Sequence, residues 1–178
     1  MKKTPFLLAI MLTSSLLVTA CNRGSSDNPA DSGGGTATGS GTMSAKIDGQ
    51  NRTATSGTVF ATYTGNNLGI VGSQVQGTSA GTFNITIANV TGTGEFRLGL
   101  APGAGGAQGI GAYATAAGSA STAQAWVTTN TETGTVNITR FDVPNKTVAG
   151  TFSFRCRSTN ATPEIRNITN GRFEARWQ

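Results

Sequence analysis

Short runs of alternating apolar and polar residues dominate the chain after residue 42, and they constrain its fold more than any other feature. In residues 82–90, Phe83, Ile85 and Ile87 alternate with polar or small residues. The same pattern recurs in residues 134–142, 150–158 and 171–178. A period of two is that of a strand with one buried face, and Thr, Val, Ile and Phe suit such a surface. We therefore expect an all-β domain.

Glycine and asparagine interrupt these runs at the intervals expected for sandwich strands. Asp48-Gly49 is a type I′ hairpin signal, and further turns are predicted at Gly65–Asn67, Thr91–Gly92, Pro144–Asn145 and Asn170–Gly171. The Gly/Ala-rich residues 101–120 predict a long loop followed by a short strand near Ala112–Thr115. The expected fold is an antiparallel β-sandwich or open barrel of about eight to ten strands over residues 43–178.

The first twenty residues have the three parts of an export signal. Lys2 and Lys3 are followed by an apolar stretch over residues 6–18 and by small residues before Cys21. The apolar stretch is shorter than the about 20 residues that span a bilayer. The ending Val18-Thr-Ala-Cys21 resembles a bacterial lipobox, in which the cysteine takes a diacylglyceryl group. We expect residues 1–20 to be a lipoprotein signal peptide and Cys21 to be lipidated; the alternative is an ordinary secretory signal.

Residues 21–42 follow as a tether. After Cys21 the segment contains no large apolar residue and is rich in glycine and serine, a composition that cannot offset the entropy of ordering. A lipid anchor and a flexible spacer would hold the domain at a bilayer, so a membrane is the expected partner. We expect a location in the cell envelope, anchored in the outer membrane and facing either the periplasm or the medium.

Three groups of segments in the domain form a pattern of paired strands. "MSAKIDGQNRTA" is an opening hairpin, "GIVGSQV" and "FNITIANVTGTGEFRLG" are middle strands, and "GTVNITRFDVPNKTVAGTFSFRC" with "NITNGRF" is a closing pair. Together, over Met43 to Phe173, they resemble an uncharacterised family of lipoprotein domains from Gram-negative bacteria. The resemblance implies a compact β domain with no established activity or ligand. The chain departs from the pattern at Arg52, where an aromatic is expected, and at Cys156, where a small residue is more usual.

The available residue types restrict the chemistry. The chain has no histidine, which removes the commonest general base and the commonest metal ligand. The motif "GIGAYA" formally matches a dinucleotide-binding loop but lacks the helix that must follow. The carboxylates that a glycosidase could use are Asp48, Glu95, Glu132, Asp142, Glu164 and Glu174. Asp48 and Asp142 lie at predicted turns and Glu174 lies between two arginines, so these three have ordinary roles as turn formers or surface charges. We expect no enzyme activity, no metal and no cofactor.

Positive charge gathers near the C-terminus, where four arginines alternate along two predicted strands. If these strands pair, the side chains of Arg155, Arg157, Arg172 and Arg176 share one solvent face. Such a face could bind anionic glycan, lipopolysaccharide phosphate or a lipid headgroup. The alternative, which we favour, is that the arginines keep an edge strand soluble. Nucleic acid is not expected, because no aromatic residues are interleaved with the basic ones.

Trp126, Trp177 and Cys156 each allow two interpretations. The tryptophans could be sugar-stacking platforms, but large aromatics on strands more often pack in the core. Cys156 alternates with Phe152 and Phe154, which predicts a small core residue with a free thiol. The alternative for an unpaired cysteine in an exported protein is an intermolecular bridge. We favour the core for all three side chains.

Three functions are compatible with these features. The leading hypothesis is a monomeric, lipid-anchored envelope lipoprotein whose β-sandwich is a non-catalytic binding or accessory module. The second is a surface lipoprotein that binds anionic glycan or lipopolysaccharide through the C-terminal arginines. The third, a glycan-active enzyme, is the least supported, because no residue set specifies a reaction.

Overall fold

A computed structural model describes residues 41–100, 103, 106–117, 123–160 and 163–177. The predicted signal peptide, Cys21 and all but the end of the predicted tether lie outside these residues. Within the described part of the chain, no helix has the length and apolar character required to cross a membrane.

The described residues form eleven strands, so the expected number was slightly too low. Their bounds are β1 Thr42–Ile47, β2 Gln50–Thr53, β3 Val59–Thr64, β4 Asn67–Gln76, β5 Ser79–Ile87, β6 Gly94–Leu98, β7 Gly109–Ala117, β8 Gln124–Val127, β9 Gly134–Asp142, β10 Thr147–Ser158 and β11 Ile165–Arg176. The all-β fold class is confirmed, and all strand pairs are antiparallel except the single β6–β7 pairing and an isolated bridge.

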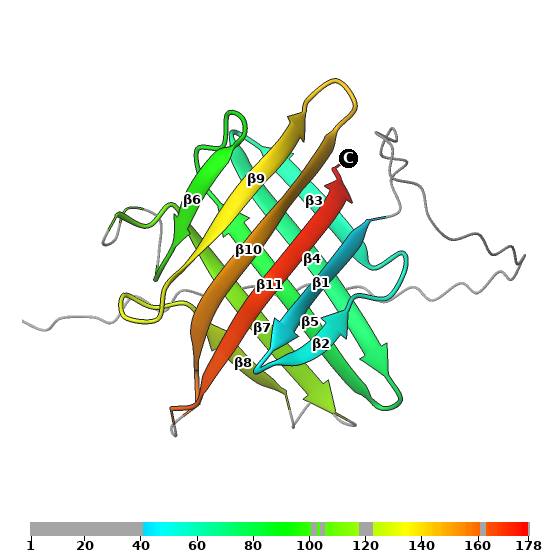
Figure 1. Cartoon of the computed structure of the whole chain (residues 1–178), viewed down its shortest axis with the longest axis vertical. Helices are drawn as coiled ribbons and strands as arrows, with labels where there is room; N and C mark the ends of the chain where they lie inside the picture. The colour runs from blue at the N-terminus through cyan, green and yellow to red at the C-terminus, as the bar shows by residue number, and fades with distance from the viewer. Residues whose placement is uncertain (1–40, 101–102, 104–105, 118–122, 161–162, 178) are drawn as a thin grey trace, which may run out of the picture. The chain divides into compact units, whose positions relative to one another are not determined.

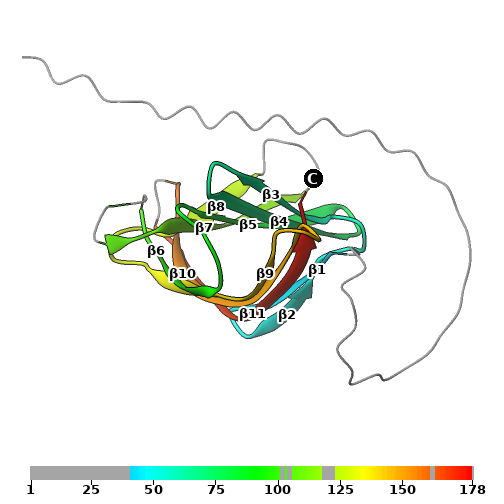
Figure 2. The same cartoon turned by 90° about the horizontal axis from the view of Figure 1, so that it is seen from above.

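One sheet contains all the strands, in the order β2-β1-β11-β10-β9-β6-β7-β5-β4-β3 (Figure 1). Seen from above, the sheet folds over so that β9, β10, β11, β1 and β2 face β3, β4, β5, β7 and β8 (Figure 2). The arrangement is that of a sandwich whose two layers are continuous through β6. The apolar sides of both layers therefore meet in one core.

Several contacts close the fold around this core. The short strand β8 pairs with β7 in one layer and with β10 in the other. On the opposite side, a bridge joins Ala61 of β3 to Trp177, which follows β11. The amide N–H groups of Ala54 and Thr55 donate to the carbonyls of Met43 and Ser73, so the β2–β3 connection also links the two layers. The sandwich thus approaches an open barrel.

The alternation seen in the sequence produces the core. In β5, Phe83, Ile85 and Ile87 are fully buried, whereas Asn84 and Thr86 between them are exposed. The ring of Phe83 lies 6.1 Å from that of Phe152 in β10, which joins the two layers directly. Burial of each such side chain contributes about 1.5–3 kcal/mol relative to exposure. The core is therefore shared and not divided between the layers.

The first predicted hairpin is confirmed, since Asp48 and Gly49 both have positive φ, of 49° and 84°, as a type I′ turn requires. The prediction of a turn at Asn170–Gly171 is wrong. These two residues lie inside β11, where Asn170 has φ 53° and the pairing registers on both sides of the strand shift. They form a bulge. A Cβ at Gly171 would lie 2.5 Å from the Phe152 ring, so this ring occupies the space of a side chain.

Strand β7 is longer than the predicted segment near Ala112–Thr115, because it spans nine residues from Gly109 to Ala117. It pairs with β5 along its whole length. Glycine at positions 109 and 111 faces the core, where a Cβ at Gly111 would lie 3.0 Å from the Phe154 ring. Since side chains from other strands fill the space at these two positions, the first half of β7 lacks the large inward apolar residues by which strands are recognised.

Candidate functional site

The four arginines predicted to share a face lie on the paired strands β10 and β11. Each of these strands has a neighbour on both sides, so the favoured expectation that the arginines protect an edge strand was wrong. Arg155 and Arg157 are opposite Asn167 and Ile165, whereas Arg172 and Arg176 are opposite Thr151 and Thr147. Since a strand rises about 3.3 Å per residue, the four-residue step from Thr151 to Arg155 separates the two pairs by ~13 Å. The arginines therefore form two separate pairs, each at its own end of the strands.

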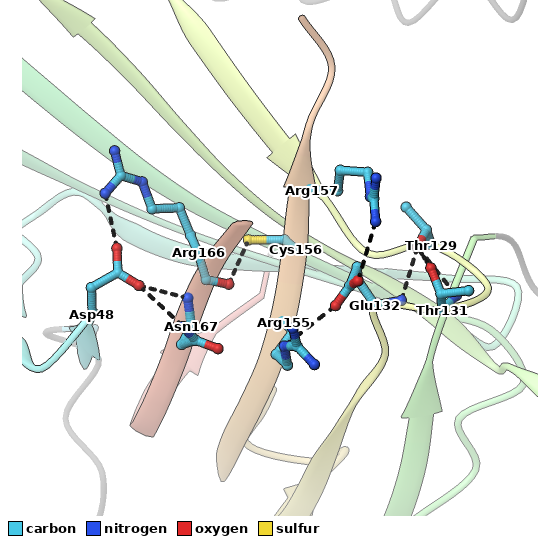
Figure 3. Close-up of polar contacts among 9 residues, drawn as sticks. All are labelled: Asp48, Thr129, Thr131, Glu132, Arg155, Cys156, Arg157, Arg166 and Asn167. Atoms are coloured by element: carbon cyan, nitrogen blue, oxygen red, sulfur yellow. Dashed lines mark hydrogen bonds and ion pairs between the residues drawn. The ribbon is translucent and has the colours of Figure 1, made fainter. Parts of the chain in front are cut away.

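The first pair is held by a buried carboxylate (Figure 3). Glu132, in the connection between β8 and β9, is 6% exposed. Its Oε2 lies 3.3 Å from Nε of Arg155 and its Oε1 3.4 Å from Nη2 of Arg157. The hydroxyl of Thr129 accepts a hydrogen bond from the Glu132 N–H at 2.9 Å, which fixes the loop. The charge of Arg155 and Arg157 is thus partly neutralised.

The second pair differs. Arg172 and Arg176 are exposed, and none of the ion pairs among the described residues includes either of them. Glu174 lies between them in the sequence, but its Oε1 accepts a hydrogen bond from Nη2 of Arg140 at 2.7 Å, across Ala149 of β10. This end of β11 therefore carries the more available positive charge.

A second polar network joins the first hairpin to β11. The carboxylate of Asp48 accepts hydrogen bonds from Nη1 of Arg166 and from the Asn167 N–H, both at 2.9 Å (Figure 3). Partial burial opposes ionisation of Asp48, but these hydrogen bonds outweigh it and lower the pKa of the carboxyl. The bond to Asp48 likewise raises the pKa of Arg166. Arg166 also pairs with Glu164 at 2.6 Å, so its charge is balanced by two acids.

Trp126 lies beneath this network and is 1% exposed. The guanidinium carbon of Arg166 is 5.0 Å from the centre of its ring, within the range of a cation–π contact. Tyr113 stacks on the same ring at 6.0 Å, and burial raises the pKa of its phenol. Trp126 therefore cannot serve as a surface platform for sugars, and this interpretation was wrong. The indole Nε1 is buried with no hydrogen-bond partner among the described residues.

Trp177 is also buried, with 5% exposure. Its ring lies 5.3 Å from Phe141 and 5.4 Å from Tyr63. The Tyr63 hydroxyl donates to the carbonyl of Val90 at 2.8 Å, so the polar tip of this cluster has a partner. The three rings connect β3, β9 and the end of β11. Their role is packing between the layers, and a sugar-stacking role for Trp177 was likewise wrong.

Cys156 is a core residue with 0% exposure and a free thiol. Its Sγ is 3.7 Å from the Arg166 carbonyl. Burial, and then the negative charge of Asp48, raise the pKa of the thiol to about 12. Because a thiolate is the reactive form, this cysteine is neither a nucleophile nor available for a bridge in the folded chain. The prediction of a packing role is in accord with this burial.

The described polar groups mainly hold strands together. No group of three or more His, Cys, Asp and Glu side chains in the described ranges could hold a metal ion. Glu132 is the one buried carboxylate among the described residues, and each of its oxygens contacts a guanidinium. Nothing in the residues near Glu132 predicted its burial, because the loop at 128–133 is rich in threonine and carries no apolar residue.

Charge is distributed very unevenly between the two layers. Thirteen basic and eight acidic residues, minus the three and two that precede Gly41, leave ten and six in the β unit, a net charge of +4. All sixteen lie outside β3, β4, β5, β7 and β8, which we call the charge-free layer. The remaining strands, with their turns, form the charged layer. Residues 53–94 and 98–131 contain no charged residue, a signal visible in the sequence that the interpretation of motifs missed.

Comparison with known proteins gives one match. Residues 39–175 match the model of a family described as a domain of unknown function, DUF6252. No curated protein and no solved structure matches the chain.

Proposed function

Since the chain belongs to the DUF6252 family of domains of unknown function, we propose that it is a lipid-anchored protein of the Gram-negative envelope. In this proposal, its β domain is a non-catalytic binding or accessory module. The observation that carries the proposal is the order of segments, in which a lipobox ending at Cys21 precedes a Gly/Ser-rich stretch and an all-β unit. An anchor and a hydrophilic spacer suit a domain that must reach a partner away from the bilayer.

The use of the charged side chains supports a non-catalytic role. Asp48, Glu132 and Glu174 each pair with an arginine from a different strand or loop. Carboxylates in these positions stabilise contacts between strands. Binding would then rely on the outer faces of the sheet, which the alternation of the strands leaves exposed.

Mass spectrometry of the mature N-terminus tests the anchor. The expected product begins at Cys21 and carries the mass of a diacylglyceryl group, and Cys21→Ser is expected to retain the signal peptide. An unmodified N-terminus at Cys21 or at a neighbouring residue would remove the anchor from the proposal. Protease treatment of intact cells then determines whether the domain faces the medium or the periplasm.

The net positive charge of the charged layer favours a second candidate function, binding of an anionic glycan or lipopolysaccharide. The exposed Arg172 and Arg176 are the preferred contacts, because Arg155 and Arg157 already pair with Glu132. Charge reversal of Arg172 and Arg176 is expected to weaken binding to lipopolysaccharide vesicles more than reversal of the other two. Unchanged binding in both double variants would eliminate this candidate.

A direct activity assay tests the absence of catalysis. We expect the purified protein to leave neutral and acidic glycans intact. Hydrolysis of any glycan that is lost in Glu95→Gln or Glu164→Gln would contradict the proposal and establish an enzyme instead.

A further inference from the structure

The outer face of the charge-free layer is an extended surface without a single charged side chain. Because side chains alternate along a strand, every second residue of β3, β4, β5 and β7 points away from the core. Each of these outward residues is exposed or half-buried. The opposite layer carries arginines at the equivalent outward positions of β10 and β11. The charged side chains of the β unit therefore lie on one side only.

Hydroxyl and amide groups occupy much of this charge-free face. The outward polar residues of β3, β4 and β5 are Thr62, Thr64, Asn67, Ser73, Thr82, Asn84 and Thr86. The hydroxyls of Ser73 and Thr82 lie 3.0 Å apart on neighbouring strands, and the Thr86 hydroxyl is 3.4 Å from the Asn84 amide oxygen. A hydroxyl has one donor and two acceptor sites, so one such contact leaves capacity for a ligand. Outward side chains repeat every ~6.8 Å along a strand, and neighbouring strands lie ~4.8 Å apart. The polar groups therefore form a regular array.

Two large apolar side chains are exposed on the same face. Phe60 of β3 is 52% exposed and Val75 of β4 is 60% exposed. Phe60 is opposite Val71, so Val75 lies four residues, or ~13 Å, further along its strand. The outward positions of the next strand, β7, are also apolar, with Ile110 opposite Thr86 and alanine at 112, 114 and 116. Apolar contacts at intervals across a polar, low-relief face suit an extended ligand with both hydroxyl groups and C–H faces.

The lack of charge on this face limits the class of ligand that it can bind. A charged polymer would lose hydration at this face without gaining an opposite charge. An anionic membrane surface requires basic residues, which the face lacks. We propose that the charge-free face binds an uncharged polysaccharide, with the threonine, serine and asparagine side chains bonding to sugar hydroxyls and Phe60 packing on a ring face. This inference rests on the proposed function as a binding module and specifies its ligand.

Affinity electrophoresis of the full-length protein in native gels tests the inference. The gels contain one of three uncharged glucans, linked α-1,4, α-1,6 or β-1,3, or the acidic polymer polygalacturonate. We expect retardation by at least one glucan that persists at 0.5–1 M salt, roughly the range in which surface charge is fully screened. Asn84→Lys is expected to weaken this retardation by about tenfold or more, equivalent to ~1.4 kcal/mol, and Phe60→Ala by a smaller factor.

Asn137→Lys provides the matched control. Asn137 is an exposed asparagine in the middle of β9 in the charged layer, as Asn84 is in β5. The control is expected to bind as the unaltered protein does, and urea unfolding is expected to show similar stability for both variants. If Asn84→Lys is unstable, the surface truncation Phe60→Ala decides the outcome.

Three results would overturn the inference. They are no retardation by any of the glucans, equal loss in the Asn84 and Asn137 variants, and retardation by polygalacturonate alone that disappears with salt. A concentration-dependent dimer that Asn84→Lys abolishes, in the absence of glucan binding, would assign the face to a second copy instead. None of these results affects the lipid anchor, because the mass of the N-terminus tests that part of the proposal separately.

Discussion

The two layers of the β unit share one core but present opposite surfaces. In the charged layer, outward arginines and acids form cross-strand contacts such as Arg140–Glu174 at 2.7 Å. In the charge-free layer, the outward positions carry hydroxyl, amide and apolar groups. Inside, Phe83 from one layer and Phe152 from the other are both buried and lie 6.1 Å apart. The two layers therefore have similar inner faces and different outer faces.

This difference shows where a function can lie. A core requires only apolar inward positions, so folding leaves the outward residues free to vary. A stretch such as residues 53–94, with no charge across three strands, is therefore not explained by the needs of the fold. Ordinary solvent-exposed sheet faces carry mixed charges, which keep them soluble and unpartnered. A uniform uncharged face is consistent with selection for contact with an uncharged partner.

The largest expected effect concerns the shared core. Phe83→Ala and Phe152→Ala should each lower the free energy of unfolding by about 3–5 kcal/mol, because each leaves a cavity between the layers. The double variant should lose less than the sum, since the rings belong to one cluster. Urea unfolding followed by tryptophan fluorescence measures these values. Two separate transitions, or a large loss in only one variant, would mean that the layers fold as independent units.

The next effect concerns the charged layer alone. Glu132→Gln removes the charge that holds Arg155 and Arg157 and should lower the free energy of unfolding by about 1–2 kcal/mol. Glu174→Gln is the control, since its side chain is 43% exposed, and it should cost less than about 0.5 kcal/mol. Thermal unfolding of the two variants compares them directly. Equal losses of stability in the two variants would show that burial does not strengthen the ion pairs of Glu132.

The smallest effect is a pH dependence at the first hairpin. Because the folded pKa of Asp48 is lowered, the unfolded state binds more protons as the pH falls through the unfolded and then the folded pKa. Stability from Asp48 is therefore present above the unfolded value of about 3.9 and declines below it. In Asp48→Asn, the free energy of unfolding measured in urea should therefore fall less between about pH 5 and pH 3, by under 1 kcal/mol. An unchanged pH profile would show that the hairpin contact does not stabilise the fold.

Much of the fold could be predicted from alternation, because β5, β9, β10 and β11 each contain a run in which apolar and polar residues alternate. Strand β7 was partly missed, since two of its inward positions are glycines, which lie beneath Leu98 of β6 and the Phe154 ring of β10. The bulge at Asn170–Gly171 was taken for a turn, because the same dipeptide supplies the positive φ that both structures need.

The site was harder to predict than the fold. Alternation placed the four arginines on β10 and β11, but only the pairing register shows that they form two groups. The contact of Asp48 with Arg166 spans 118 positions in the sequence, and no local pattern reports it. The burial of Trp126 and Trp177 depends on rings from other strands, so the choice between core and surface required the folded structure.

The claim that the charge-free face is the one that meets a partner can be tested most directly by NMR. Amide chemical shifts of the isotopically labelled protein are recorded during titration with oligosaccharides of the glucan that causes the strongest retardation. The account predicts saturable shifts at outward residues of β3, β4 and β5, with Asn84 and Thr86 among the largest, and unchanged shifts at Arg172 and Arg176. Shifts centred on β10 and β11, or none at saturating glucan, would contradict it.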